Sequence, residues 1–307
     1  MAEQKGGTQF TLFFIQRFKG KVLFNVPMSA HTSLNIGGSA DVMAFPQDEA
    51  DLKDLIQFAE AKGFQFYIIG AGTNLLVRDN GIRGIVINMT EGFNGITWLD
   101  KTKAVVGAGV KLSQLLNGCK ERGLGGLEFA CGIPGTVGGG VAMNAGAYGG
   151  EMKDVVDGVE IAGKKGQRGF LSKTELNFSY RRAEMPRGAV IVRAHMSFVS
   201  RTPEEIGEKI KEFRERRKAS AQITSPSAGS IFKNPEGLSA GKLIEEAGFK
   251  GMRLGGAKVS EAHANYIVND DGAKAKDVLT LMAEIRDKVY AKTGVLLEPE
   301  IKVLGED

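Results

Sequence analysis

The sequence has few of the residues that build disulfide or metal sites. It contains two cysteines, Cys119 and Cys131, and three histidines among 307 residues. Two cysteines do not make a disulfide framework, and no Cys/His spacing resembles a zinc site. We therefore expect no bound metal, and a reducing cytoplasm is the simplest setting for the chain.

An excess of one charge and long apolar runs are also missing. The 40 basic and 36 acidic residues give a net charge of +4, which is too even to indicate nucleic-acid binding. It is compatible with an anionic small substrate. No apolar run approaches the roughly 18 residues that a membrane span needs. The apolar start lacks a signal cleavage site, so we expect a short amphipathic helix packed on the body. Its apolar residues are Phe10, Leu12, Phe14, Ile15 and Phe18.

Helix-like and strand-like patterns alternate along the chain and predict a mixed α/β protein of about two domains. Periodicity and end signals predict helices at 48–62, 113–123, 240–247 and 275–292, and one that begins at Thr202. There Pro203 suits the first helical position and Glu205 completes a capping box. Apolar runs predict strands at 64–70, 84–89, 104–109, 159–163, 189–199, 264–269 and 298–305.

Residues 132–149 read GIPGTVGGGVAMNAGAYG, with seven glycines and no charge. Glycine destabilises both helix and strand, so one regular element cannot span this segment. A surface linker would be polar, but this segment contains Val137, Val141 and Tyr148. We therefore expect a loop whose backbone approaches a ligand closely and binds it through N–H groups.

A second uncharged glycine loop, Gly70–Asn74, directly follows the strand at 64–70. It is not a Rossmann fingerprint, because Leu75 replaces the third glycine and a strand follows instead of a long helix. The chain also has no GxxxxGK[ST] motif. Two such loops could hold the two phosphates of a dinucleotide, and flavin adenine dinucleotide (FAD) is most consistent with that arrangement.

Five segments carry a resemblance to a known family. They are HTSLNIGGSAD (31–41), IIGAGTNLLVRD (68–79), GLEFACGIPGTVGGGVAMNAGAYGGE (126–151), SAGSIFKNP (227–235) and HANYIVN (263–269). Together, and in this order, they closely resemble the UDP-N-acetylenolpyruvoylglucosamine reductase (MurB) family of bacterial peptidoglycan synthesis. The resemblance runs from about Phe24 to the last strand. No insertion lies between Val199 and Thr202, which is similar to the family's shorter subtype without a lid tyrosine.

The resemblance implies a fold of the α+β (mixed α/β) class and a domain order. A helical extension at 1–23 precedes an FAD-binding domain of the PCMH-type flavin fold at 24–200, with subdomains at about 24–92 and 93–200. A substrate-binding domain at 201–307 follows, and its last strand returns to the active site. We expect a cytoplasmic monomer whose partners are a UDP-sugar and NADPH, with no nucleic-acid or membrane partner.

The implied reaction reduces the enolpyruvyl double bond of a UDP-sugar to give UDP-N-acetylmuramate, with non-covalent FAD as cofactor and NADPH as co-substrate. Hydride addition next to a carboxylate places negative charge on it, so the site needs a cation and a proton donor. By the resemblance, Arg181 binds the carboxylate, Ser230 donates the proton and Glu300 stabilises or protonates the intermediate. Glu298, two residues away on the same strand face, could be confused with Glu300.

The expected cofactor-binding residues lie in the two glycine loops. They are Ile69, Gly70, Ala71, Gly72, Thr73, Asn74, Ile133, Pro134, Gly135, Thr136, Gly138, Gly139, Asn144, Gly146, Ala147 and Tyr148. The resemblance further implies substrate contacts by Tyr180, Lys218, Lys233, Asn234 and His263. The basic run Arg214, Arg216, Arg217 and Lys218 has helical spacing and suits either a solvated helix face or the steering of an anionic substrate.

The chain departs from the family pattern at two positions. Ala183 stands where the family usually has serine, which removes any hydrogen bond from that side chain. Ile223 follows Gln222 where proline is usual.

Two other functions stay open from the residues. One is another FAD oxidoreductase of the PCMH-type fold that acts on a small alcohol or sugar, often with covalent flavin, since His31 and Cys131 lie in or near the flavin-type motifs. The other is a non-catalytic nucleotide-binding protein, which would need no set of Arg181, Ser230 and Glu300.

Overall fold

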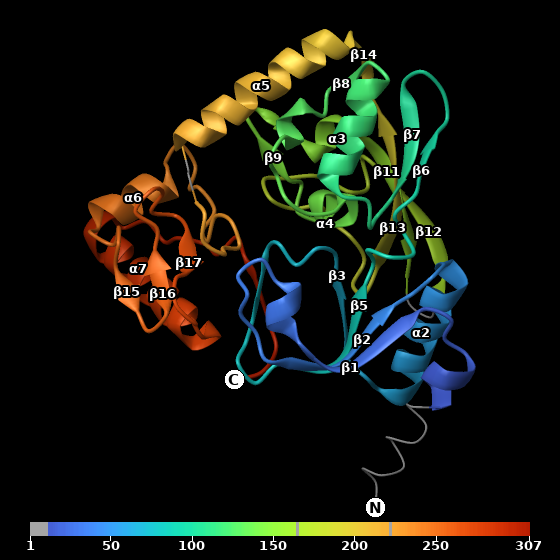
Figure 1. Cartoon of the computed structure of the whole chain (residues 1–307), viewed down its shortest axis with the longest axis horizontal. Helices are drawn as coiled ribbons and strands as arrows, with labels where there is room; N and C mark the ends of the chain where they lie inside the picture. Colours follow the sequence, from blue (N-terminus) through green and yellow to red (C-terminus); the bar gives the residue numbers. More distant parts are fainter. Residues whose placement is uncertain (1–11, 164–165, 221–222) are drawn as a thin grey trace, which may run out of the picture. The chain divides into compact units, whose positions relative to one another are not determined.

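The computed structural model describes residues 12–163, 166–220 and 223–307 (Figure 1). The chain divides into two compact units that each combine several stretches of sequence. Unit 1 contains the chain up to Phe24 together with Val42–Ala71 and Gly84–Arg214. Unit 2 contains Asn25–Asp41, Gly72–Arg83 and Glu215–Asp307. Strands and helices occur in both units, so the predicted mixed α/β class is confirmed.

An antiparallel sheet forms the centre of unit 1. Its strand order is β12–β11–β13–β7–β6. The strands span Arg168–Ser172, Val156–Ala162, Val190–Ser197, Lys103–Gly107 and Ile96–Trp98 in that order. Helix α3 (Leu112–Glu121) shares its hydrophobic core with this sheet. The sequence predicted this helix at 113–123 with Ser113 as its cap, but it begins at Leu112 and Lys111 is the N-cap, so the predicted cap was wrong.

A second sheet has the order β1–β2–β5–β3, with β3 parallel to β5. Its strands span Lys21–Pro27, Ser39–Phe45, Ile82–Asn88 and Phe66–Ile69. Helix α2 (Glu49–Lys62) packs its buried Leu52, Leu55, Ile56 and Ala59 into the core shared with β2 and β5. These four residues have the helical spacing that predicted a helix at 48–62. Asp48 caps the helix through the Asp51 N–H, and Gly63 ends it in the left-handed conformation.

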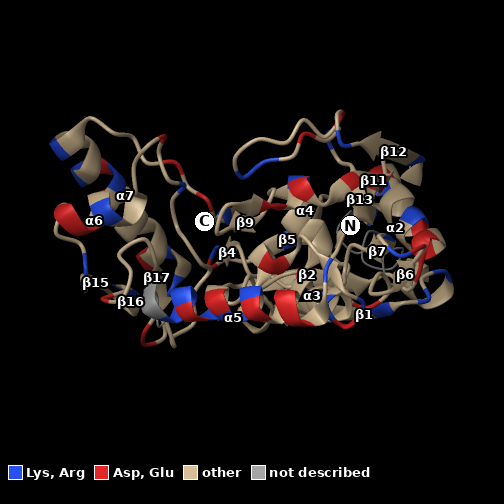
Figure 2. Ribbon diagram, turned by 90° about the horizontal axis from the view of Figure 1, so that it is seen from above, with Lys and Arg blue, Asp and Glu red and all other residues tan. Residues whose placement is uncertain are grey.

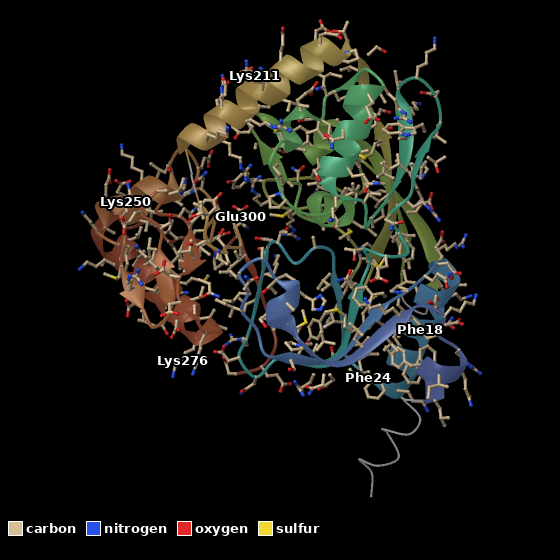
Figure 3. All side chains as sticks on the ribbon, viewed as in Figure 1. Phe18, Phe24, Lys211, Lys250, Lys276 and Glu300 are labelled. Atoms are coloured by element: carbon tan, nitrogen blue, oxygen red, sulfur yellow. The ribbon has the colours of Figure 1, made fainter. Side chains whose placement is uncertain are left out.

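The N-terminal segment packs on α2 through aromatic rings. Residues 12–16 are helical, and Phe13, Phe14 and Phe18 are buried (Figure 3). Phe13 stacks on Phe58 of α2 with ring centroids 4.1 Å apart. Leu12 and Ile15 were predicted on the apolar face but are 43% and 74% exposed, because Phe13 takes that face instead. Phe10 lies outside the described residues.

Helix α5 (Pro203–Ser220) begins where the capping box predicted. The Thr202 N–H donates to Glu205 Oε2 at 2.8 Å, and the Glu205 N–H donates to Thr202 Oγ1 at 3.2 Å. Just before it, β14 (Val199–Ser200) pairs with β8 (Leu124–Gly125), so the chain passes directly from β14 into α5. Residues 199–203 therefore contain no inserted loop.

Unit 2 is built around helices α6 (Ala240–Glu246) and α7 (Ala275–Thr293). A small sheet has the order β15–β16–β17, with strands at Arg253–Leu254, Ala257–Val259 and Ile267–Asn269. The last strand, β18 (Lys302–Leu304), runs parallel to β4 (Leu75–Val77). Both β18 and β3 are shorter than the predicted runs 298–305 and 64–70.

The two units do not follow the sequence-based domain division of 1–23, 24–200 and 201–307. Along α5 they divide at Arg214, and unit 2 also takes in two N-terminal stretches. The sequence-based limits concern functional domains, and that division stays a prediction. No helix within the described residues is long and apolar enough to cross a membrane.

Candidate active site

Both predicted glycine loops reach one pocket inside unit 1. The pocket has a volume of about 160 Å³. Ile69 and Gly70 line it from the end of β3, and Thr136, Gly138 and Gly139 line it from the second loop. The sequence did not predict the remaining lining residues, although Ile68 and Ala142 lie within the motif segments 68–79 and 126–151. The remaining lining residues are Ile68, Met89, Ala108, Ala142, Met185, Ala189, Val190 and Ile191.

Two glycines, which have no side chain, let the walls of this pocket pack closely together. A Cβ added at Gly70 would collide with the hydroxyl oxygen of Thr136, which is 2% exposed. A Cβ at Gly138 would lie 2.8 Å from the Cβ of Ala108. Gly138 sits in α4 (Val137–Ala142), a short helix inside the glycine-rich segment. Glycine at these two positions therefore serves close packing of the pocket walls against Thr136 and Ala108.

Part of the second glycine loop is hydrogen-bonded to other segments of unit 1. The N–H groups of Val137 and Gly138 donate to the carbonyls of Val110 and Ala108, both at 2.8 Å. Only the other N–H groups of the loop can then serve a ligand, which narrows the expectation that backbone donors hold it. Gly146–Ala147 form β9, which pairs with β10 (Gly150–Glu151) through a tight turn at Tyr148. Tyr148 stacks on Phe213 of α5, with ring centroids 4.5 Å apart.

The remainder of the first loop belongs to unit 2. Gly72 has φ +66° and packs so closely on the His31 carbonyl that a Cβ would collide with it. The hydroxyl of Ser33 donates to the Thr73 carbonyl at 3.3 Å, and Asn74 Nδ2 donates to the Glu300 carbonyl at 3.1 Å. Gly72 and Thr73 are thus held against residues 31–33, and Asn74 against the segment before the last strand, all within unit 2.

Asn144 joins three segments of unit 1. It is fully buried, and its Nδ2 donates to Glu151 Oε2 at 2.7 Å and to the Ser179 carbonyl at 3.0 Å. Its Oδ1 accepts the Lys153 N–H at 3.0 Å. Burial alone would raise the pKa of Glu151, but hydrogen bonds from Lys153 and Asn144 and the positive charge of Arg181 lower it below its ordinary value. The sequence predicted Asn144 as a cofactor contact, whereas its side chain is used within the protein.

Arg181 lies in unit 1 at the tip of a tight turn. Ser179 and Arg182 exchange backbone hydrogen bonds of 2.9 and 3.2 Å around it. Arg181 has φ 57°, which is the left-handed region that non-glycine residues rarely occupy. Its guanidinium lies 5.0 Å from the ring centroid of Tyr180, which is 44% exposed. Ala183, the departure from the family pattern, is buried in the hydrophobic core.

Ser230 and Glu300 lie on adjacent segments of unit 2. The Glu300 N–H donates to the Ile231 carbonyl at 2.7 Å, and Phe232 forms a bridge with Pro299. Asn265 holds the other side of this segment, because its side chain accepts the Phe232 N–H and donates to the Phe232 carbonyl. The chain therefore brings these two predicted catalytic residues together, while Arg181 belongs to unit 1.

Lys233 and Asn234 each have partners of their own. Lys233 Nζ lies 3.2 Å from Glu298 Oε2, so Glu298 and Glu300 differ in surroundings although they are two residues apart. Asn234 Oδ1 accepts the Ala240 N–H at the start of α6. Both side chains are at least partly accessible and lie on the segment that follows Ser230.

His263 is a partly buried imidazole in unit 2. Burial lowers the pKa of His263 below its ordinary value, so the neutral ring is favoured at neutral pH. Its Nδ1 accepts the Asn265 N–H at 3.2 Å, and its ring meets Tyr266 edge-on at 5.0 Å. A neutral ring with these contacts supports the segment that holds Phe232.

Lys218 is exposed near the end of α5. Figure 2 shows basic and acidic residues alternating along this helix, as a solvated helix face would have. The basic run that begins at Arg214 therefore does not make a stripe of one sign. Gln222 lies outside the described residues.

Known proteins resemble the chain over nearly its whole length. Residues 221–304 match a family model described as the C-terminal domain of UDP-N-acetylenolpyruvoylglucosamine reductase, and residues 40–168 match an FAD binding domain. The UDP-N-acetylenolpyruvoylglucosamine reductase of Caldanaerobacter subterraneus is 46% identical over 94% of this chain and 95% of its own length. That of Geobacter metallireducens is 43% identical over 94% and 96%. The crystal structure of the Thermus caldophilus reductase has a TM-score of 0.80 and 36% identity, covering 94% of this chain and 99% of that one.

Proposed function

The chain belongs to the UDP-N-acetylenolpyruvoylglucosamine reductase family, and we propose that Arg181, Ser230 and Glu300 carry the reaction of that family here. The reaction is the NADPH-dependent reduction of UDP-N-acetylglucosamine enolpyruvate to UDP-N-acetylmuramate, a step of peptidoglycan precursor synthesis. Identity of 43–46% over 94% of the chain supports this function over oxidation of a small alcohol or sugar.

We infer that the glycine-lined pocket of unit 1 holds part of the cofactor FAD. Gly70, Gly138 and Gly139 line it with backbone and no side chain, which suits close approach of a ligand. When bound there, FAD would supply the hydride-transfer chemistry between NADPH and the enolpyruvyl carbon. We assign Ile69 and Gly70 and the loop around Thr136 to holding this cofactor without a covalent bond.

The carboxylate next to the double bond needs a cation during the reaction. When hydride adds to one carbon, the electron pair of the double bond moves toward the other carbon and the carboxylate, giving an enolate-like intermediate. Arg181 offers a planar guanidinium that can bind both carboxylate oxygens. Its position at the tip of a tight turn supports this assignment. Tyr180 lies under the guanidinium and limits its orientations.

The second carbon of the double bond must gain a proton, for which we assign the Ser230 hydroxyl. Serine is a weak acid, so this step needs a strongly basic intermediate in contact with the hydroxyl. Glu300 stabilises or protonates the intermediate beside it. The backbone hydrogen bond from Glu300 to Ile231 carries this assignment, because it keeps the two segments adjacent. Lys233 and Asn234, just after Ser230, are assigned to the diphosphate and sugar.

Separate measurement of the two half-reactions tests the role of Ser230. In Ser230→Ala, NADPH should still reduce the flavin at close to the wild-type rate, while reduction of the enolpyruvyl UDP-sugar should fall by about 10²–10⁴-fold, as for loss of a general acid. Ser227→Ala, a change in the same segment, is the control and should leave both rates unchanged. Equal loss of both half-reactions in Ser230→Ala would mean that Ser230 is structural.

We further propose that the protein acts as a cytoplasmic monomer. Its small net charge of +4 supports the absence of a nucleic-acid partner. Sedimentation of the purified chain gives the oligomeric state directly, and a mass twice that of the chain would contradict the monomer.

A further inference from the structure

The turn that carries Arg181 is strained and must be held from outside. A left-handed conformation is unfavourable for a non-glycine residue and persists only where its surroundings fix it. The two hydrogen bonds between Ser179 and Arg182 close the turn but do not attach it to unit 1.

Two hydrogen bonds attach this turn to the second glycine loop. The Ala183 N–H donates to the Ala142 carbonyl of α4 at 3.1 Å. On the other side of the turn, Asn144 Nδ2 donates to the Ser179 carbonyl at 3.0 Å. Both anchors come from the segment that lines or adjoins the glycine pocket.

The end of α4 fixes the backbone of Asn144 independently of the contact between its side chain and the turn. It follows α4 in the left-handed conformation with φ 41°. Its N–H donates to the Val141 carbonyl at 3.0 Å, and the Ala145 N–H donates to the Gly140 carbonyl at 2.8 Å, which is a Schellman end. Glycine would accept this backbone conformation too, but only asparagine also supplies two N–H donors and an acceptor.

The donors of Asn144 are both used inside the protein. One serves Ser179 and the other serves Glu151, whose Oε2 also lies 2.8 Å from Lys153 Nζ. With its side chain buried and its donors engaged, Asn144 has none left for a cofactor.

We propose that Asn144 is a positioning residue, which fixes the turn of Arg181 through the Ser179 carbonyl and so ties the carboxylate-binding arginine to the cofactor loop. This inference rests on the role of Arg181 in the proposed function. It assigns Asn144 to substrate reduction, although its place in the glycine-rich segment suggested a contact with the cofactor.

Asn144→Asp is the sharpest variant, because aspartate keeps the shape and the acceptor but removes both donors and adds charge beside Glu151. The substrate half-reaction of the FAD-loaded enzyme should slow by about 10- to 100-fold, as expected for misplacement of a binding group. The dissociation constant of FAD, followed by flavin fluorescence, and the rate of flavin reduction by NADPH should each change by less than about 3-fold. Asn144→Gly keeps the left-handed backbone and should show the same pattern.

Asp51→Asn is the matched control, since Asp51 is a buried carboxylate of unit 1 that accepts the N–H groups of Lys19, Gly20 and Gln47. Asp51→Asn should lower the melting temperature, and it should not slow substrate reduction more than flavin reduction. Combining Asn144→Asp with Arg181→Lys should slow substrate reduction no more than Arg181→Lys alone, because both act through one group.

Weaker FAD binding, or equal slowing of both half-reactions, would overturn the positioning role of Asn144. If Asn144→Asp reduced the substrate at the wild-type rate while Arg181→Lys was slow, the positioning role of Asn144 would be overturned and the role of Arg181 would stand. Full substrate reduction in Arg181→Lys would overturn both. Failure of Asn144→Asp and Asn144→Gly to fold would also overturn it, since Asn144 would then serve the stability of unit 1.

Discussion

The absent side chain at Gly70 lets the first glycine loop approach the second. We expect Gly70→Ala to push Thr136 out of position, because threonine has few χ1 alternatives and this one is buried. Overpacking of this kind costs about 1–3 kcal/mol. The melting temperature should fall and FAD should bind more weakly in fluorescence titrations.

Gly95→Ala is the control for this change, since a Cβ there has nothing within 4 Å. It should leave both FAD affinity and melting temperature near those of the parent. Normal FAD affinity in Gly70→Ala would mean that the pocket beside Gly70 does not hold the cofactor.

Burial of His263 makes stability depend on pH. Because the pKa of the folded imidazole lies below its ordinary value of 6.5, the unfolded chain takes up the proton first as the pH falls. The stabilisation is complete above pH 6.5 and is lost as the pH falls from there toward the folded pKa. Urea unfolding at about pH 7.5 and pH 5.5 should therefore show a larger loss of stability in the wild type than in His263→Gln. The same loss in both proteins would contradict this account.

At the scale of elements, the sequence predicted those helix ends that neighbouring residues determine. Asp48 and Gly63 mark the ends of α2, and Thr202 with Glu205 marks the start of α5, so both helices could be predicted from neighbouring residues. Helix α4 could not, because three of its six residues are glycine and only contact with Ala108 and its surroundings makes a helix favourable there.

Distant contacts also begin helices, as Asp79 does for α7. Its carboxylate accepts the N–H groups of Ala275 and Lys276 at 2.8 and 3.0 Å, almost 200 residues further along the chain. No local pattern around Asp79 or Ala275 predicts this pairing. We expect Asp79→Ala to destabilise unit 2 by about 1 kcal/mol, as for the loss of an N-cap, whereas Asp79→Asn keeps an acceptor and should cost less. Chemical denaturation compares the two, and equal stability of Asp79→Ala and the wild type would show that water caps α7 as well.

At the scale of the whole molecule, the predicted fold class and family are confirmed, and the predicted domain division stays a prediction beside compact units that the sequence did not predict. The chain passes from one compact unit to the other at several points, and Gly70 and Gly72 of one short loop belong to different units. Composition does not change at these crossings, so only three-dimensional contacts reveal them. The same holds for Ser230 and Glu300, whose motifs are 70 residues apart in sequence and adjacent through Ile231.

Substrate-dependent oxidation of NADPH by the purified, FAD-loaded protein tests the central claim most directly. Absorbance of NADPH should fall rapidly when UDP-N-acetylglucosamine enolpyruvate is added, with UDP-N-acetylmuramate formed in equal amount. Without that substrate, only slow oxidation by oxygen should remain. NADPH consumption that does not respond to the enolpyruvyl UDP-sugar would contradict the assignment of this chain as its reductase.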